Sequence, residues 1–98
     1  MPKCPDSKGN LRYRQLERIT KGVANHRRIE ILDLLHREPQ LSVMEISEKL
    51  GVNFKTISEH VRRLTHAGLV LKRSEGAAVR HALSPQGFLI LKFLRTLE

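Results

Sequence analysis

Apolar residues in the first part of the chain stand at helical spacings and predict two helices there. From Leu11 to about Val23 they are interleaved with arginines and lysines. A wider apolar stripe over residues 29–35 follows Asn25, a residue type that caps helices by accepting a backbone N–H, and it stops before Pro39. We therefore expect one helix over residues 11–23 and a second between Asn25 and Pro39.

The next two predicted helices are separated by very few residues. Ser42 and Glu45 have the spacing of a capping box, in which each side chain satisfies the other's free backbone amide. This helix covers residues 43–50 and ends at Gly51, which supplies the left-handed conformation that a helix end favours. A new apolar stripe follows within three residues, and its members are Phe54, Ile57, Val61 and Leu64. Two short helices joined by such a turn form a helix-turn-helix.

The remaining sequence predicts a hairpin and a last helix. Gly68 closes the preceding helix, and two short apolar segments, residues 69–71 and 79–83, flank a polar loop that contains glycine. Ser84-Pro85 then combines a cap with the proline favoured at the first helical position, and the helix continues to Glu98. The expected fold is mainly α with a small β-hairpin.

The chain of 98 residues is organised as a short tail followed by one domain. Residues 1–10 contain two prolines, a glycine and no apolar periodicity, which predicts a mobile tail, and residues 11–98 show no second linker. Cys4 is the single cysteine, so an internal disulfide is excluded. A domain this small buries a limited core, and a partner subunit would help its stability.

The charge of the chain points to a polyanionic partner. Eighteen Lys and Arg stand against ten Asp and Glu, a formal net charge of +8. With no Trp, one Tyr and three Phe, the chain offers little for stacking single-stranded bases, so duplex nucleic acid fits better. The excess is uneven: residues 53–81 carry six cations against two acids, residues 26–50 four against five, and residues 1–25 six against two.

The helix that follows the short turn is the candidate for DNA contact. Opposite its apolar stripe it carries cations suited to phosphates and short polar groups suited to base edges. The expected contact residues are Lys55, Thr56, Ser58, Glu59, Arg62 and Arg63. Glu59 would repel DNA unless it accepts a hydrogen bond from a cytosine amino group or from a neighbouring arginine. The alternative is an ordinary solvated face with i,i+4 ion pairs, but the concentration of charge favours the DNA contact.

Cations also bracket the hairpin loop. Lys72, Arg73 and Arg80 could reach the DNA backbone or the minor groove beside the helix. The alternative is a charged edge that protects a short hairpin from aggregation, a use to which Lys and Arg are also put.

Together these residues resemble the winged helix-turn-helix of ArsR-type bacterial and archaeal transcriptional repressors. The likeness is carried by residues 24–32, 41–46, 55–64 and 67–70, and it covers about residues 11–98. It implies a homodimer whose recognition helices enter successive major grooves of a partly palindromic operator, about 34–36 Å apart, with release triggered by a ligand.

Carried over by position, the resemblance assigns groups of residues to each part of the DNA contact. The groove-facing residues it implies are Lys55, Thr56, Ser58, Glu59 and Arg62. The wing residues it implies are Lys72, Arg73, Arg80 and His81. Ala77 departs from the family, which often has a basic residue after the loop glycine.

The metal sites common in this family are missing from the sequence. Residues 42–45, where many members have cysteine thiolates, read Ser-Val-Met-Glu. Residues 88–98, where others place a zinc site, offer only a terminal carboxylate, whereas zinc needs about four donors. The five histidines show no ligand spacing either. We expect no metal and no cofactor. Any inducer would therefore be something other than a metal ion.

The last helix is apolar on nearly all sides and predicts a dimer seam. Seven of the last eleven residues are apolar, more than a small monomer can cover, and the helix over residues 11–23 could supply the other side. The expected interface residues are Leu11, Tyr13, Leu16, Phe88, Leu89, Leu91, Phe93 and Leu97. The alternative is that this helix packs only within its own chain and leaves two or three residues exposed.

The sequence as a whole predicts a homodimeric repressor that binds specific sequences of double-stranded DNA. No nucleophile elbow, phosphate loop or carboxylate pair supports an enzyme. Two alternatives stay open: an adaptor that uses the same fold to bind proteins, and a chromatin-like DNA binder without sequence preference. No apolar run approaches the length of a membrane span, and no signal peptide is evident, so we expect a soluble cytoplasmic protein.

Overall fold

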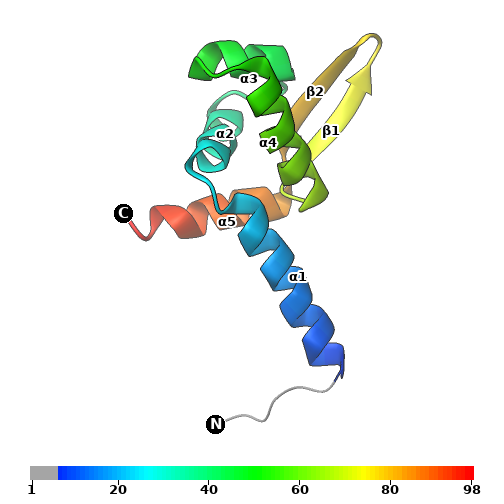
Figure 1. Ribbon diagram of the computed structural model, residues 1–98, viewed down its shortest axis with the longest axis vertical. Helices are drawn as coiled ribbons and strands as arrows, with labels where there is room; N and C mark the ends of the chain where they lie inside the picture. The colour runs from blue at the N-terminus through cyan, green and yellow to red at the C-terminus, as the bar shows by residue number, and fades with distance from the viewer. Residues whose placement is uncertain (1–6) are drawn as a thin grey trace.

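The structure is a computed structural model that describes residues 7–98, with side chains from Arg12 onward. The elements, coloured along the chain in Figure 1, are α1 (Ser7–Val23), α2 (His26–Arg37), α3 (Val43–Leu50), α4 (Phe54–His66), β1 (Val70–Glu75), β2 (Ala78–Leu83) and α5 (Pro85–Arg95). Their order confirms the predicted mainly α fold with a β-hairpin, a winged helix-turn-helix. Cys4 and the rest of residues 1–6 lie outside the described residues.

The local signals read from the sequence act as predicted in α2 and α3. The Asn25 side chain accepts a hydrogen bond from the Arg27 backbone N–H at 2.9 Å. Ser42 and Glu45 form the complete capping box, with the Ser42 N–H donating to the Glu45 carboxylate at 2.9 Å and the Glu45 N–H donating to Ser42 Oγ at 3.2 Å. Gly51 ends α3 with φ of 66°, in the left-handed region.

The turn between α3 and α4 is held by side-chain hydrogen bonds at both ends. Ser47 Oγ donates to the Val52 carbonyl at 2.6 Å, which ties α3 to the turn. The Asn53 side chain accepts from the backbone N–H groups of Lys55 at 2.8 Å and Thr56 at 3.3 Å, and so caps α4. The start of α4 therefore has a fixed place relative to α3.

Several element boundaries differ from the prediction. The helix α1 begins at Ser7, so residues 7–10 are helical although they contain Gly9, and α5 ends at Arg95 before a cap at Thr96. The hairpin strands run to Glu75 and from Ala78, so the loop is shorter than expected. Five of the six residues of β1 are exposed, so polar residues fit this strand as well as the loop.

The hydrophobic core lies between α2, α3, α4, the base of the hairpin and α5. Its fully buried members include Ile31, Leu32, Leu35, Ile46, Ile57, Leu64 and Leu69. Phe54 was expected in the same stripe as Ile57, but 48% of it is exposed because it is the first residue of α4 and lies beyond the edge of the core. The other three members of the stripe, Ile57, Val61 and Leu64, are buried.

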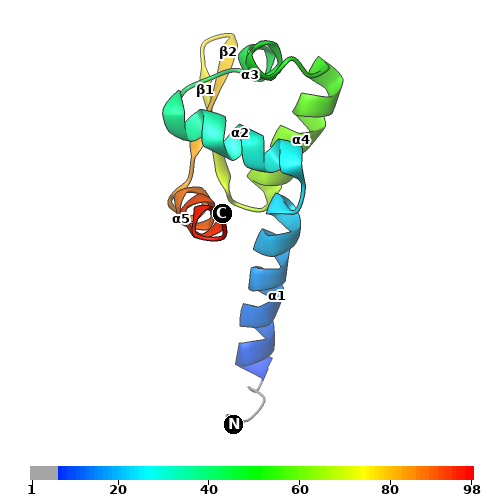
Figure 2. The same ribbon diagram turned by 90° about the vertical axis from the view of Figure 1, so that its left-hand side faces the viewer.

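The helix α1 projects away from this core, while α5 crosses close to the end of α1 at which α2 begins (Figures 1 and 2). Where α1 meets α4, a Cβ on Gly22 would lie 2.5 Å from the Cβ of Ala67, so only glycine allows this approach. Within residues 7–98, none of the helices is both long and apolar enough to cross a membrane.

Candidate nucleic-acid interface

The outer face of α4 carries the residues expected to contact DNA. Because Ile57, Val61 and Leu64 fix the opposite face in the core, the outer face turns toward solvent. Lys55, Thr56, Glu59, Arg62 and Arg63 are exposed, and Ser58 is half-buried. All six side chains lie on one helix, and five of them are exposed.

Glu59 is engaged by its arginine neighbours. Arg62 donates to both carboxylate oxygens, from Nη2 at 2.7 Å and from Nε at 3.1 Å, and Arg63 Nε donates to Oε1 at 3.1 Å. These hydrogen bonds lower the pKa of Glu59 to about 2, so the carboxylate stays ionised. In this structure Glu59 follows the neighbouring-arginine alternative, and i,i+3 and i,i+4 ion pairs are present on the face.

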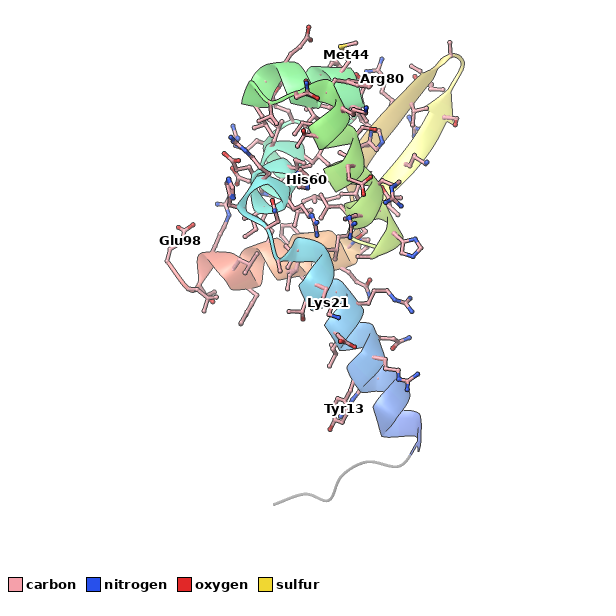
Figure 3. All side chains as sticks on the ribbon, in the orientation of Figure 1. Tyr13, Lys21, Met44, His60, Arg80 and Glu98 are labelled. Atoms are coloured by element: carbon pink, nitrogen blue, oxygen red, sulfur yellow. The ribbon has the colours of Figure 1, made fainter. Side chains whose placement is uncertain are left out.

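The hairpin holds its cations in different ways. Lys72 and Arg73 are exposed on β1, and Arg73 pairs with Glu75 at 2.9 Å. Arg80 on β2 instead reaches α3 and the segment before it: its Nη1 donates to the Glu45 carboxylate of α3 at 3.3 Å and to the Gln40 carbonyl at 3.2 Å. Figure 3 places Arg80 next to α3. Arg80 therefore joins the wing to the start of the helix-turn-helix.

His81 is buried, which the sequence did not predict. The family resemblance assigns His81 to the DNA-contacting wing, but only 3% of the residue is accessible, so this assignment is wrong. Its Nδ1 lies 3.0 Å from the Leu41 carbonyl oxygen, and its backbone pairs with Leu41 as an isolated bridge that extends the hairpin. Burial lowers the pKa of His81. Its role is structural, because a buried ring cannot contact DNA.

The apolar residues expected at a dimer seam divide into two groups. Six are exposed in the single chain: Tyr13, Leu16, Phe88, Leu89, Phe93 and Leu97. Leu91 is 4% exposed and packs in the core, so its assignment to the seam is wrong. The side chain of Leu11 lies outside the described residues. Apolar surface on α1 and α5 therefore remains uncovered in one chain.

A basic groove was missed by reasoning from the sequence. Arg18, Lys21, Arg28 and His66 lie together with Arg62 and Arg63 where α1, α2 and α4 meet. These residues are far apart along the chain, and the only signal in the sequence was the positive excess of residues 1–25. Among the residues described, no cluster of three His, Cys, Asp or Glu could hold a metal ion.

Several curated proteins are similar in sequence. The chain is 38% identical over 66 residues to the transcriptional activator HlyU of Vibrio cholerae, which covers 67% of this chain and 60% of HlyU. It is 40% identical over 62 residues to the HTH-type transcriptional regulator Rv0324 of Mycobacterium tuberculosis, which covers 63% of this chain and 27% of that protein. The chain thus spans less than two thirds of these relatives. They are named as transcriptional regulators, a non-enzymatic class.

Solved structures agree in fold. The homodimeric winged helix-turn-helix DNA-binding domain (fragment 1-100) of Mb0332 from Mycobacterium bovis, a possible ArsR-family regulator, gives a TM-score of 0.83 at 30% identity, with 99% of this chain and 89% of that chain covered. The structure of HlyU from Vibrio cholerae gives a TM-score of 0.76 at 31% identity, with 88% of this chain and 94% of the HlyU chain covered. The profile of the bacterial regulatory protein, arsR family, matches residues 25–72. Taken with the helix-turn-helix and its wing, these likenesses show that the chain belongs to the ArsR family of bacterial regulatory proteins.

Proposed function

We propose that the protein is a homodimeric transcriptional repressor that binds a specific, partly palindromic sequence of double-stranded DNA without a metal or other cofactor. The observation that carries this proposal is the outer face of α4. That face combines Lys55, Arg62 and Arg63 with the short polar side chains of Thr56 and Ser58, while the inner face is locked in the core. A rigid helix of this composition suits the major groove.

The first turn of α4 is the part best suited to read bases. Lys55 and Thr56 are there, and their backbone N–H groups are oriented by the Asn53 cap. A helix N-terminus also carries partial positive charge, which favours its approach to a polyanion. Lys72 and Arg73 on β1 then extend the contact to the neighbouring backbone or minor groove.

The uncovered apolar faces of α1 and α5 supply the dimer in this proposal. A two-fold pair built on Tyr13, Leu16, Phe93 and Leu97 buries surface that a single chain leaves in water. Two α4 helices about 34–36 Å apart then match one turn of B-DNA. A dimer on such a site excludes polymerase by occupancy, so repression needs no additional surface.

The test is selection of duplexes from a random pool, followed by binding titrations over a range of salt. We expect a palindromic motif, and an affinity that falls about 10³–10⁵-fold between about 50 and about 200 mM salt if six to ten phosphates are contacted. Lys55→Ala combined with Arg62→Ala should abolish binding while circular dichroism and light scattering stay unchanged. Arg37→Ala is the matched control, because Arg37 pairs with Asp33 on the surface of α2.

Other outcomes contradict the proposal in distinct ways. A flat salt response, or no enriched duplex, rules out a DNA-binding repressor and leaves the adaptor that binds proteins. Strong binding with nearly equal affinity for all duplexes leaves a sequence-blind DNA binder.

A further inference from the structure

A groove of about 230 Å³ lies where the end of α1, the start of α2 and the end of α4 meet. Its basic side chains are those of Arg18, Lys21, Arg28, Arg62, Arg63 and His66. No carboxylate is part of this lining. In Figure 3 Lys21 lies at the end of α1 below α4, and His60 lies higher on α4. Three helices thus direct cationic side chains into one open depression.

The groove is held by the approach of α1 to α4. Gly22 and Ala67 form the contact that brings the two helix ends together, and both line the groove. Arg28 then fixes α2 in place, because its Nη1 donates to the carbonyls of Lys21 and Gly22, each at 3.2 Å, and its Nε donates to His60 Nδ1 at 3.2 Å. Acceptance of this bond needs a neutral ring. Burial and the Arg28 charge both lower the pKa of His60, which favours that form.

The positive charge of the groove is only partly balanced by the protein. Glu17 pairs with Lys21 at 3.1 Å, and Glu59 pairs with Arg62 and Arg63. Among the side chains the structure describes, Arg18, Arg28 and His66 have no carboxylate within ion-pair distance. Five permanent cations therefore face two nearby carboxylates. Such an excess in a concave site attracts an anion.

We propose that this groove binds a phosphate of the DNA backbone beyond the C-terminal end of α4. The inference rests on the proposed function and adds a contact that neither the α4 face nor the wing provides. Arg62 and Arg63 belong to both the α4 face and the groove, so one continuous basic surface joins them. A second groove shares Arg18, His66 and Ala67 with the first and extends along α1 as far as Arg12, beside Leu16 of the proposed seam. An open track of this kind suits a polymer of phosphates rather than one enclosed ion.

The test removes two groove charges that have no part in the core. Arg18 and Lys21 are both exposed, and Arg18→Gln with Lys21→Gln should weaken binding to the selected duplex and to a scrambled duplex by the same factor, about tenfold. The slope of log affinity against log salt should become shallower by about one for each phosphate lost. Arg14→Gln is the matched control, because Arg14 is exposed on the same helix but lines neither groove. Thermal melting establishes that each variant is folded.

Three other results would contradict the proposal for the groove. If the double variant keeps the affinity and salt slope of the wild type, while Lys55→Ala with Arg62→Ala still abolishes binding, the groove proposal is overturned and the proposed function stands. If inorganic phosphate shifts the amide resonances of the groove but the double variant binds duplex normally, the groove is a free-anion site, and the backbone assignment is wrong. If the wild type binds no duplex at all, both the proposed function and the groove proposal are overturned.

Discussion

The helices α4 and α5 are built alike on their inner faces and differ on their outer ones. Each is anchored in the same core, α4 by Ile57, Val61 and Leu64 and α5 by Leu91. The outer face of α4 is charged, whereas α5 exposes Phe88, Leu89 and Phe93, and Leu97 is exposed just beyond its end. A charged face is well solvated in water and can bind a polyanion with release of that polyanion's counterions, but an apolar face in water is unfavourable until another protein surface covers it. The two faces therefore call for different partners.

The largest effect is expected on the stability of the fold, from a substitution that loosens the attachment of α5 to the core. A Cβ on Gly87 would lie 2.1 Å from the Leu69 carbonyl oxygen, so Gly87→Ala must push the start of α5 away from the core. We expect a loss of about 3 kcal/mol in the free energy of unfolding, measured by denaturant titration. Gln86→Ala, at the exposed neighbouring position, should change it by less than about 0.5 kcal/mol. Equal stability of the two variants would show that the start of α5 is not closely packed against Leu69.

The next effect separates the partners of the two faces. Phe93→Asp on α5 removes an apolar side chain that is 57% exposed in the single chain and should raise the dimer dissociation constant about 30-fold, equivalent to about 2 kcal/mol. Light scattering over a dilution series measures this change. Arg62→Asp on α4 should leave the dimer intact while it weakens DNA binding. Dissociation by Arg62→Asp, or none by Phe93→Asp, would show that the two surfaces are not divided in this way.

Acid should destabilise the half of the molecule that contains the α4 face. His60 on α4 and His81 beside α3 both have lowered pKa values because burial disfavours their charged form. Below the ordinary pKa of 6.5 the unfolded chain takes up protons that the folded chain resists, so stability falls as the pH drops. Melting temperatures between about pH 5 and about pH 7 should show this loss, and His81→Gln should reduce it. An unchanged pH dependence in that variant would exclude His81 as its source.

The smallest effect concerns the internal ion pairs of the α4 face. Glu59→Gln frees Arg62 and Arg63 for phosphates and should strengthen binding to all duplexes by about twofold to fivefold, with a steeper salt dependence. Titration of the selected motif and of single-base variants measures both quantities. Loss of preference at one base pair would instead identify Glu59 as a base reader, as a cytosine contact requires.

The helix-turn-helix could be predicted in detail because its signals are local. The Ser42–Glu45 box, Gly51 and the stripe from Ile57 to Leu64 each depend on residues within a few positions of one another. The start of α1 had no such signal, since a helix that projects from the core has little apolar periodicity near its beginning. Phe54 shares the periodicity of the stripe but lies past the edge of the core, which the spacing alone does not reveal.

The features that could not be predicted depend on contacts between distant parts of the chain. His81 is buried because Leu41 pairs with β2, an isolated bridge with no sequence signature. Arg80 turns from the wing to Glu45 for the same reason, since β2 passes beside the start of α3. The basic groove collects residues from three helices, and only the fold brings Arg18 near Arg62. Composition could count these charges, but their grouping depends on how the helices cross.

The crossing of Gly22 and Ala67 also gives α1 the properties of a lever. With 17 residues at about 1.5 Å each, α1 is about 25 Å long, and it is held only near its C-terminal end, by this contact, by the Arg28 hydrogen bonds and by Val23 in the core. A tilt of about 10° at the crossing would move the far end of α1 by about 4 Å. If α1 forms the seam of the proposed dimer, the angle of α1 at this crossing helps to set the separation of the two recognition helices. Two small residues that contact no base would then influence which spacing of DNA half-sites the dimer fits.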